Sequence, residues 1–294
     1  MKIKDSLGDR IFNIIIYVIL AALVLIVLYP LWLVLINSFS DSNAVSLGKV
    51  TILPVGFNLD AYKETFAYDN VISGYLNSLY YTVVGTVISL LLTIPVAYTL
   101  SKKNLKGRGF LMIVFTFVMY FSGGLIPEYI IIRDLGLVNT REVVLLVGAL
   151  SVYNMIVARS FFEGGVPHEL EEAAEIDGCN QLQTFVRIVL PLSKAMIGVI
   201  TLYYAVAKWN SFTPSLYYQT MVPQYHSLQM VLRDLILRAQ DVVNNKGEDA
   251  IYWAELLNKI KYSVIVVASV PMLVIFPFVQ KYFDKGVMLG SVKG

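Results

Sequence analysis

The sequence is poor in the residues that carry metal and thiol chemistry. Cys179 is its only cysteine, which excludes an internal disulfide. His168 and His226 are its only histidines, so a metal site of the usual cysteine and histidine kind has almost no ligands. The segment "HELEE" resembles the H-E-x-x-H motif of zinc proteases, but Glu172 stands where the second histidine must be. We therefore predict no catalytic residue and no metal site.

Two further signals are missing. No G-x-x-x-x-G-K-[ST] phosphate loop occurs, so the chain cannot bind ATP in the P-loop manner. No basic patch interleaved with aromatic residues occurs either, and such a patch would be typical of a nucleic-acid-binding protein. We predict that this chain binds no cofactor and no nucleic acid.

Charge is scarce because long stretches of the chain carry none. Only 15% of the residues are charged and 57% are apolar, whereas soluble globular domains carry roughly 25% charged residues. An apolar run of about 18 or more residues is typical of a membrane-spanning helix. The sequence therefore predicts an all-α membrane protein with a single membrane domain over residues 1–294. The six predicted transmembrane helices are 14–36, 76–100, 110–132, 143–160, 195–219 and 262–281.

The distribution of lysine and arginine predicts the orientation. The short loop "SKKNLKGRG" after the second predicted span carries four positive charges and no acid, and such loops face the cytoplasm. Both termini and the loop 163–191 then lie in the cytoplasm, and the long loops 37–75 and 223–261 lie outside. The first span is too long for the apolar part of a signal peptide, and no cleavage signal follows it, so we expect it to remain as an anchor.

The loop 163–191 contains a short acidic segment with the marks of a helix. Pro167 is suited to a first helical turn, and the glutamates that follow are favoured there by the helix dipole. Gly178 is suited to the stop. A helix of about ten residues is too short to be stable alone in water. The pattern favours a helix that is completed by docking on a cytoplasmic partner, over the simpler alternative of a solvated acidic loop.

The same loop resembles the cytoplasmic motif in the membrane subunits of binding-protein-dependent ABC importers. That motif reads E-A-A, three residues, G, nine residues, I, one residue, L-P, and every fixed position is matched from Glu172 to Pro191. The segments "GGLIPEYIIIRDLGLVNT", "KWNSF" and "YFDKGVMLGSVKG" are similar to the carbohydrate-uptake, maltose-permease-like branch, and in particular to its oligosaccharide and polysaccharide permeases. The resemblance covers essentially the whole chain.

This resemblance implies a type I ABC importer permease fold with a cytoplasmic coupling helix, in the cytoplasmic membrane of a bacterium. It implies three kinds of partner, namely a second homologous permease, two cytoplasmic ATPase subunits that bind ATP and Mg, and an extracytoplasmic solute-binding protein. The implied function is import of a carbohydrate, in particular an oligosaccharide, either neutral or uronic. The residues implied to couple this chain to the ATPases are Glu171, Glu172, Ala173, Ala174, Asp177, Gly178, Ile188 and Pro191.

Polar residues within the spans are candidates for the solute path. A charge at Lys208 is costly inside a membrane and marks a functional hypothesis. Either its ammonium reaches the outer interface, or it lines the path with Trp209, which could stack on a sugar ring, and Asn210, which could bond sugar hydroxyls. Tyr153 and Asn154 are candidates of the same type.

Three alternatives and one local question remain open. An ion-coupled secondary carrier would need intramembrane carboxylates, and the spans offer only Glu128. A membrane-embedded enzyme would need clustered acids or a metal site facing one side of the membrane. A permease of the same family could also carry a solute other than a sugar. Residues 120–124 could form a helix break that lines a cavity or a site of close helix packing, and the sequence favours packing.

Overall fold

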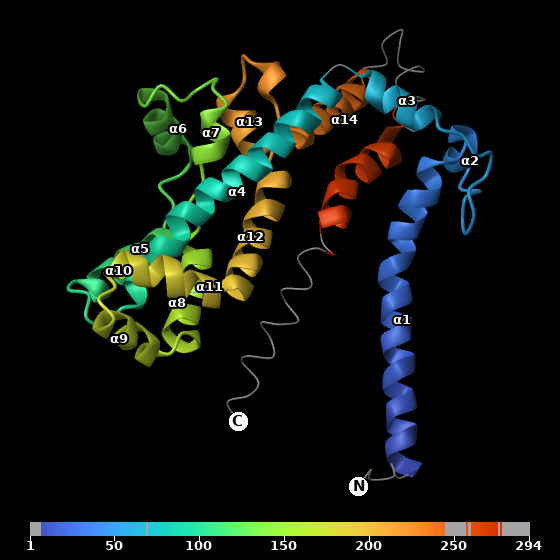
Figure 1. The fold of residues 1–294 in the computed structure, drawn as a ribbon. Coiled ribbons are helices and arrows are strands. Elements are labelled where there is room, and N and C mark those ends of the chain that lie inside the picture. Colours follow the sequence, from blue (N-terminus) through green and yellow to red (C-terminus); the bar gives the residue numbers. More distant parts are fainter. Residues whose placement is uncertain (1–6, 69, 245–256, 258–259, 276, 278–294) are drawn as a thin grey trace. The chain divides into compact units, whose positions relative to one another are not determined.

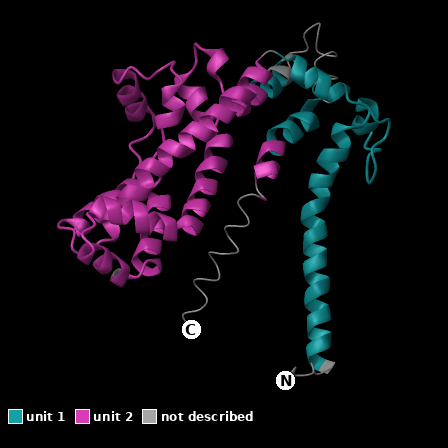
Figure 2. Cartoon of the chain, in the orientation of Figure 1, with its two compact units in different colours: residues 1–69, 234–269 teal, residues 70–233, 270–294 magenta. Residues whose placement is uncertain are grey.

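The computed structural model describes residues 7–68, 70–244, 257, 260–275 and 277, and all regular structure in these residues is helical (Figure 1). The chain divides into two compact units (Figure 2). Unit 1 comprises residues 1–69 and 234–269, and unit 2 comprises residues 70–233 and 270–294.

Unit 1 is built around one long apolar helix, α1 (Leu7–Ser38), which contains the predicted first span. Its end is fixed by short segments that fold back on it. Trp32 donates from its indole nitrogen to the carbonyl of Ile52 at 2.8 Å, and the hydroxyls of Ser38 and Tyr62 lie 2.8 Å apart. These contacts order the predicted outer loop, which contains the helices α2 (Ser42–Ser46) and α3 (Asp60–Ala67).

Unit 2 is organised around α4 (Val71–Ser101), which packs against α8 (Val152–Gly165) and α12 (Lys194–Trp209) (Figure 1). The buried residues of α4 include many small or hydroxyl-bearing side chains, which let neighbouring helices approach closely. The three helices share an apolar core toward the second half of α4. The buried members of that core are Ile94, Ala97, Leu100, Met155, Ala158, Phe162, Val189, Met196, Ile200 and Tyr204.

The predicted third span is not one straight helix. It consists of α5 (Arg108–Tyr120) and α6 (Leu125–Asp134), which meet at an angle of 113°. Gly124 has a φ of +88°, which side chains other than glycine rarely adopt, and a Cβ at Gly123 or Gly124 would meet nothing within 4 Å. The packing that the sequence favours for this segment is therefore wrong, and the alternative of a helix break is confirmed.

The predicted fourth and fifth spans are also interrupted. Residues 143–160 contain α7 (Glu142–Leu146) and α8, separated by a short break. Residues 195–219 contain α12 and α13 (Thr213–Tyr218), again separated by a break. Hydropathy alone does not detect these breaks, because most of the residues that form them are apolar or small.

The loop 163–191 folds into short helices before it enters α12. These are α9 (His168–Ile176), α10 (Gln181–Thr184), a π-helical segment (Phe185–Val189) and α11 (Leu190–Leu192). The axis then turns by 81° between Gln181–Leu192 and Lys194–Trp209. Beyond α13, a short 3-10 turn (Pro223–Tyr225) leads to the amphipathic helix α14 (Leu228–Asn244).

The sequence predicts six spans, and the described residues contain fewer straight ones. Two helices, Gly8–Ser38 and Val71–Ser101, are long and apolar enough to cross a membrane, and the number rises to four if each bent pair counts as one span. A shorter apolar helix, Ile260–Ile275, lies in the predicted sixth span. The rest of that span, apart from Pro277, and most of 245–261 lie outside the described residues.

Candidate functional site

The predicted docking helix is present as α9, and its end has the predicted form. Asp177 is the C-cap, and Gly178 follows with a φ of +81°. The amide of Gly178 donates to the carbonyl of Glu175 at 3.0 Å, and the amide of Cys179 donates to the carbonyl of Ala174 at 2.9 Å. This pair of hydrogen bonds is the Schellman arrangement, in which a left-handed glycine satisfies the last carbonyls of a helix.

One side of α9 is fastened to the end of α4. Ala174 is buried, and the Glu171 carboxylate accepts hydrogen bonds from the Lys102 ammonium and, at 3.2 Å, from the Tyr98 hydroxyl. The Lys102 ammonium also lies 4.2 Å from the centre of the Tyr98 ring, and that ring stacks on Phe185 at 4.7 Å. The predicted coupling residues Glu171 and Ala174 thus hold α9 in place.

The rest of α9 and the helix that follows it present an exposed surface. Glu172, Ala173 and Asp177 are exposed, as the docking prediction requires. The most exposed apolar side chain here is Ile176, at 87%, and Leu182 of α10 is 70% exposed. Neither is among the predicted coupling residues, although the apolar character of both is evident in the sequence. We call these five residues the docking surface.

The two remaining predicted coupling residues lie outside α9. Ile188 belongs to the π-helical segment and is half-buried, and Pro191 is exposed in α11. Both lie just before the bend at Ser193. They therefore belong to the connection between the acidic loop and α12, and not to the docking surface.

A second cluster of charges lies near the same end of α4. Glu163 of α8 accepts hydrogen bonds from Arg108 of α5 and, at 2.8 Å, from Arg159 one turn earlier in α8. The Nε of Arg159 donates at 3.1 Å to the carbonyl of Leu100. One carboxylate therefore joins α5 and α8, and Arg159 joins both to α4.

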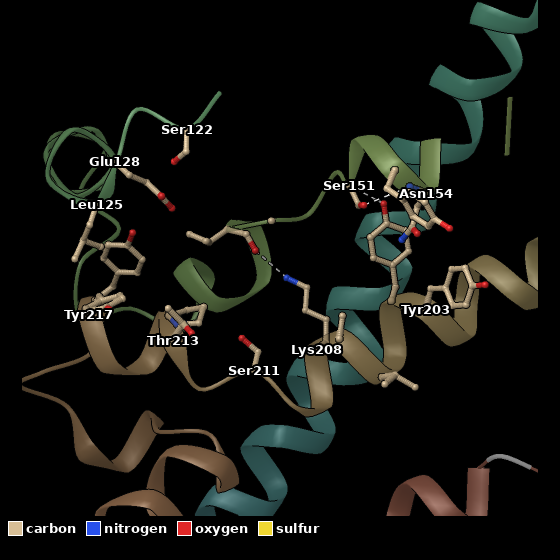
Figure 3. A pocket seen from close by; sticks show the side chains of 18 of the residues that line it. Ser122, Leu125, Glu128, Ser151, Asn154, Tyr203, Lys208, Ser211, Thr213 and Tyr217 are labelled. Atoms are coloured by element: carbon tan, nitrogen blue, oxygen red, sulfur yellow. Dashed lines mark hydrogen bonds between the residues drawn. The ribbon is translucent and has the colours of Figure 1, made fainter. Parts of the chain in front are cut away.

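Unit 2 also contains a cavity of about 920 Å³ (Figure 3). It is lined from α6, from the break between α7 and α8, and from α8, α12 and α13. Tyr153, Tyr203 and Tyr217 line it, and these residues are 55%, 40% and 38% exposed. Polar groups that could bond a solute line it too. They are Ser122, Glu128, Ser151, Asn154, Ser211 and Thr213.

Three of the five predicted path residues line this cavity, namely Tyr153, Asn154 and Lys208. Trp209 and Asn210 are not among the lining residues. Trp209 is only 1% exposed and meets the ring of Tyr75 edge-on, with ring centres 5.7 Å apart. A ring covered in this way is not placed to stack on a sugar in this conformation.

Lys208 is buried and its ammonium is fully bonded. Its side chain is 7% exposed, and Nζ donates to the carbonyls of Val144, Leu145 and Val147 at 2.9, 3.1 and 3.0 Å. An ammonium has three hydrogens to donate, so all three are used. Of the two alternatives for Lys208, the one in which its ammonium reaches the outer interface does not fit the structure, because the ammonium binds the carbonyl end of α7.

The cavity also includes residues that sequence reasoning missed. These are Tyr203 and Tyr217. Ser122 and Gly124 also line the cavity, from the break between α5 and α6 that the sequence left open as an alternative to packing. The glycine pair in "SGGLIP" was the available signal for that break. Both members of the tyrosine pairs 203–204 and 217–218 line the cavity, and nothing in the sequence around these pairs indicated it.

Known proteins resemble this chain over most of its length. Residues 71–289 match the family described as binding-protein-dependent transport system inner membrane component. The polygalacturonan/rhamnogalacturonan transport system permease protein YtcP of Bacillus subtilis is 38% identical over 286 residues, which cover 97% of this chain and 99% of that protein. Protein LplC of the same organism is 38% identical over 290 residues, which cover 99% and 97%.

A solved structure is similar over nearly the same extent. It is a bacterial ABC transporter involved in the import of the acidic polysaccharide alginate. The matched chain has a TM-score of 0.81 and 32% sequence identity, covering 96% of this chain and all of that one. The likeness therefore extends over nearly the whole of both chains.

Proposed function

This chain belongs to the family of binding-protein-dependent transport system inner membrane components, and from that membership we propose that it is the permease subunit of an ATP-driven importer of uronic oligosaccharides. The observation that carries the proposal is the full-length likeness, at 38% identity, to a permease named for polygalacturonan and rhamnogalacturonan. The likeness to an importer of alginate, another acidic polysaccharide, supports the same substrate class.

The cavity supports a sugar as the solute. Tyrosine rings such as those of Tyr153, Tyr203 and Tyr217 offer flat apolar surfaces with a polar tip, and these match the apolar face and the hydroxyls of a pyranose. Asn154 and nearby hydroxyls can both donate and accept hydrogen bonds. The volume of about 920 Å³ is at the upper end of pockets for small molecules, which suits a solute of more than one sugar ring.

The docking surface supports an external source of energy. Partner ATPase subunits would bind Glu172 through a basic residue and cover the exposed Ile176, and their closure on ATP would move α9. Because Glu171 ties α9 to Lys102 at the end of α4, that movement reaches the helix against which α8 and α12 pack. These helices contribute to the cavity, so the cavity changes its access when the ATPases close. A second homologous permease completes the path, and a solute-binding protein delivers the sugar to the outer loops.

Transport by the complete importer in liposomes tests the proposal. We expect ATP-dependent uptake of a labelled oligogalacturonide in the presence of its binding protein, and much weaker uptake of a neutral galacto-oligosaccharide of equal length. Preference for the neutral sugar would contradict the uronic substrate class. Uptake that persists without ATP and stops when an ionophore collapses the ion gradients would instead identify an ion-coupled carrier.

A further inference from the structure

The break between α7 and α8 forms one wall of the cavity, and residues 144–151 are called the wall segment here. Val147, Gly148 and Ser151 of this segment line the cavity. Ser151 is also the N-cap of α8, and its hydroxyl accepts from the amide of Asn154 at 3.3 Å. The position of the wall segment therefore also sets the position of Asn154, another lining residue (Figure 3).

A break of this kind leaves backbone groups without helical partners. The last carbonyls of α7 have none within the helix, and irregular backbone at membrane depth is stable only where protein or water satisfies it. The Lys208 ammonium binds the carbonyls of Val144, Leu145 and Val147. A cation at the carbonyl end of a helix is also favoured by the helix dipole. Lys208 thus fixes the first half of the wall segment.

A second side chain of α12 fixes the other half. The Tyr204 hydroxyl accepts from the amide of Ser151 at 2.9 Å and lies 2.5 Å from the hydroxyl of Thr93 on α4. Tyr204 and Lys208 are four residues apart, so they share one face of α12. That face therefore holds the wall segment at both ends.

The packing of α4 is adapted to this arrangement. The stem of Lys208 passes over Gly85, where a Cβ would lie 3.3 Å from both Cδ and Cε of the lysine. A contact this close requires the neighbour to shift, so a glycine at this position leaves room for the lysine to reach the wall segment. Gly85 belongs to α4 and Lys208 to α12. Residues of two helices are therefore adapted to the contact between Lys208 and the wall segment.

We propose that Lys208 and Tyr204 are positioning residues that hold the wall segment against α12, so that the cavity retains its solute between delivery from outside and release inside. This inference rests on the proposed import function and goes beyond it, because it assigns solute retention to two side chains. Lys208 acts through the backbone that it binds, since its three hydrogens are used by carbonyls. Loosening the wall allows solute to escape while ATP hydrolysis continues.

The test is the number of sugars imported per ATP hydrolysed by the complete importer in liposomes, measured with an oligogalacturonide. Lys208→Met keeps the length of the side chain and removes all three donors. We expect it to lower this ratio about tenfold, the size of effect expected when hydrogen bonds to a charged group are lost. Tyr204→Phe keeps the ring and removes one neutral hydrogen-bonding group, so its ratio should fall about threefold.

Thr201→Val is the matched control. Thr201 lies on the same helix, but its hydroxyl bonds only the carbonyl of Ile197 within α12, at 2.7 Å, so its ratio should equal that of the unaltered importer. A merely structural role for Lys208 would reduce the amount of active importer and lower sugar import and ATP hydrolysis together, leaving the ratio unchanged. An unchanged ratio in Tyr204→Phe, or in Lys208→Met where that variant folds, overturns the inference. Absence of sugar import by the unaltered importer would overturn the proposed function instead.

Discussion

The end of α9 allows a sharp test of coupling through Gly178. Gly178 has a φ of +81°, and a Cβ added there would meet nothing within 4 Å. Replacement by alanine therefore adds backbone strain without a steric clash. The left-handed conformation costs an L-residue roughly 1–2 kcal/mol, and about 1.4 kcal/mol corresponds to a factor of ten in an equilibrium constant.

That cost falls on a helix with little stability of its own. α9 has nine residues, and isolated helices shorter than about 12 residues are marginal in water. A strained end favours conformations in which the two hydrogen bonds that close α9 are lost, and these conformations cannot dock. We therefore expect Gly178→Ala to weaken binding of the ATPase subunits about tenfold.

The assay is titration of purified ATPase subunits onto the permease in lipid nanodiscs, followed by sugar-stimulated ATP hydrolysis. Gly178→Asn should bind nearly as well as the unaltered permease, because asparagine adopts the left-handed conformation more readily than alanine. Gly164→Ala is a second control, since Gly164 lies in α8 without positive φ and its Cβ would meet nothing. Unaltered binding by Gly178→Ala, or equal loss in the asparagine variant, would refute the reasoning.

Two further predictions concern the charge clusters near the end of α4. Glu171→Lys should separate α9 from Lys102 and lower the number of sugars imported per ATP hydrolysed. The double variant Lys102→Glu with Glu171→Lys restores the opposite charges and should recover much of this loss. If the double variant does not recover, the contact does not anchor α9. Glu163→Ala removes the acceptor shared by Arg108 and Arg159 and should lower the free energy of unfolding by about 1 kcal/mol, a value expected for a partly exposed network. Thermal unfolding in detergent measures this change, and equal midpoints for the two proteins would contradict it.

The docking helix could be predicted from the sequence because its signals are local. The glutamates of its first turn and the glycine at its stop lie within one short segment, and each acts on neighbouring backbone groups. Gly178 takes the left-handed conformation that the stop requires. The anchoring function of Glu171 could not be predicted, because its partner Lys102 is 69 residues away and is brought near only by the packing of α4.

The spans and the cavity were less predictable for a related reason. Hydropathy reports how apolar a stretch is, and the breaks at residues 121–124 and 147–151 leave that average almost unchanged. The chemistry of a side chain also does not reveal what covers it. Trp209 and Lys208 are adjacent in the sequence, yet one packs against Tyr75 and the other binds the end of α7.

The bend at Ser193 has a consequence for the lipid around the protein. α12 has 16 residues, so at 1.5 Å per residue its length is about 24 Å, whereas the hydrocarbon core of a bilayer is about 30 Å thick. A short helix meets this hydrophobic mismatch by thinning the bilayer beside it, at a cost that grows with acyl-chain length. Because α12 is short and also holds the wall segment, the thickness of the surrounding membrane acts on the helix that positions the cavity wall.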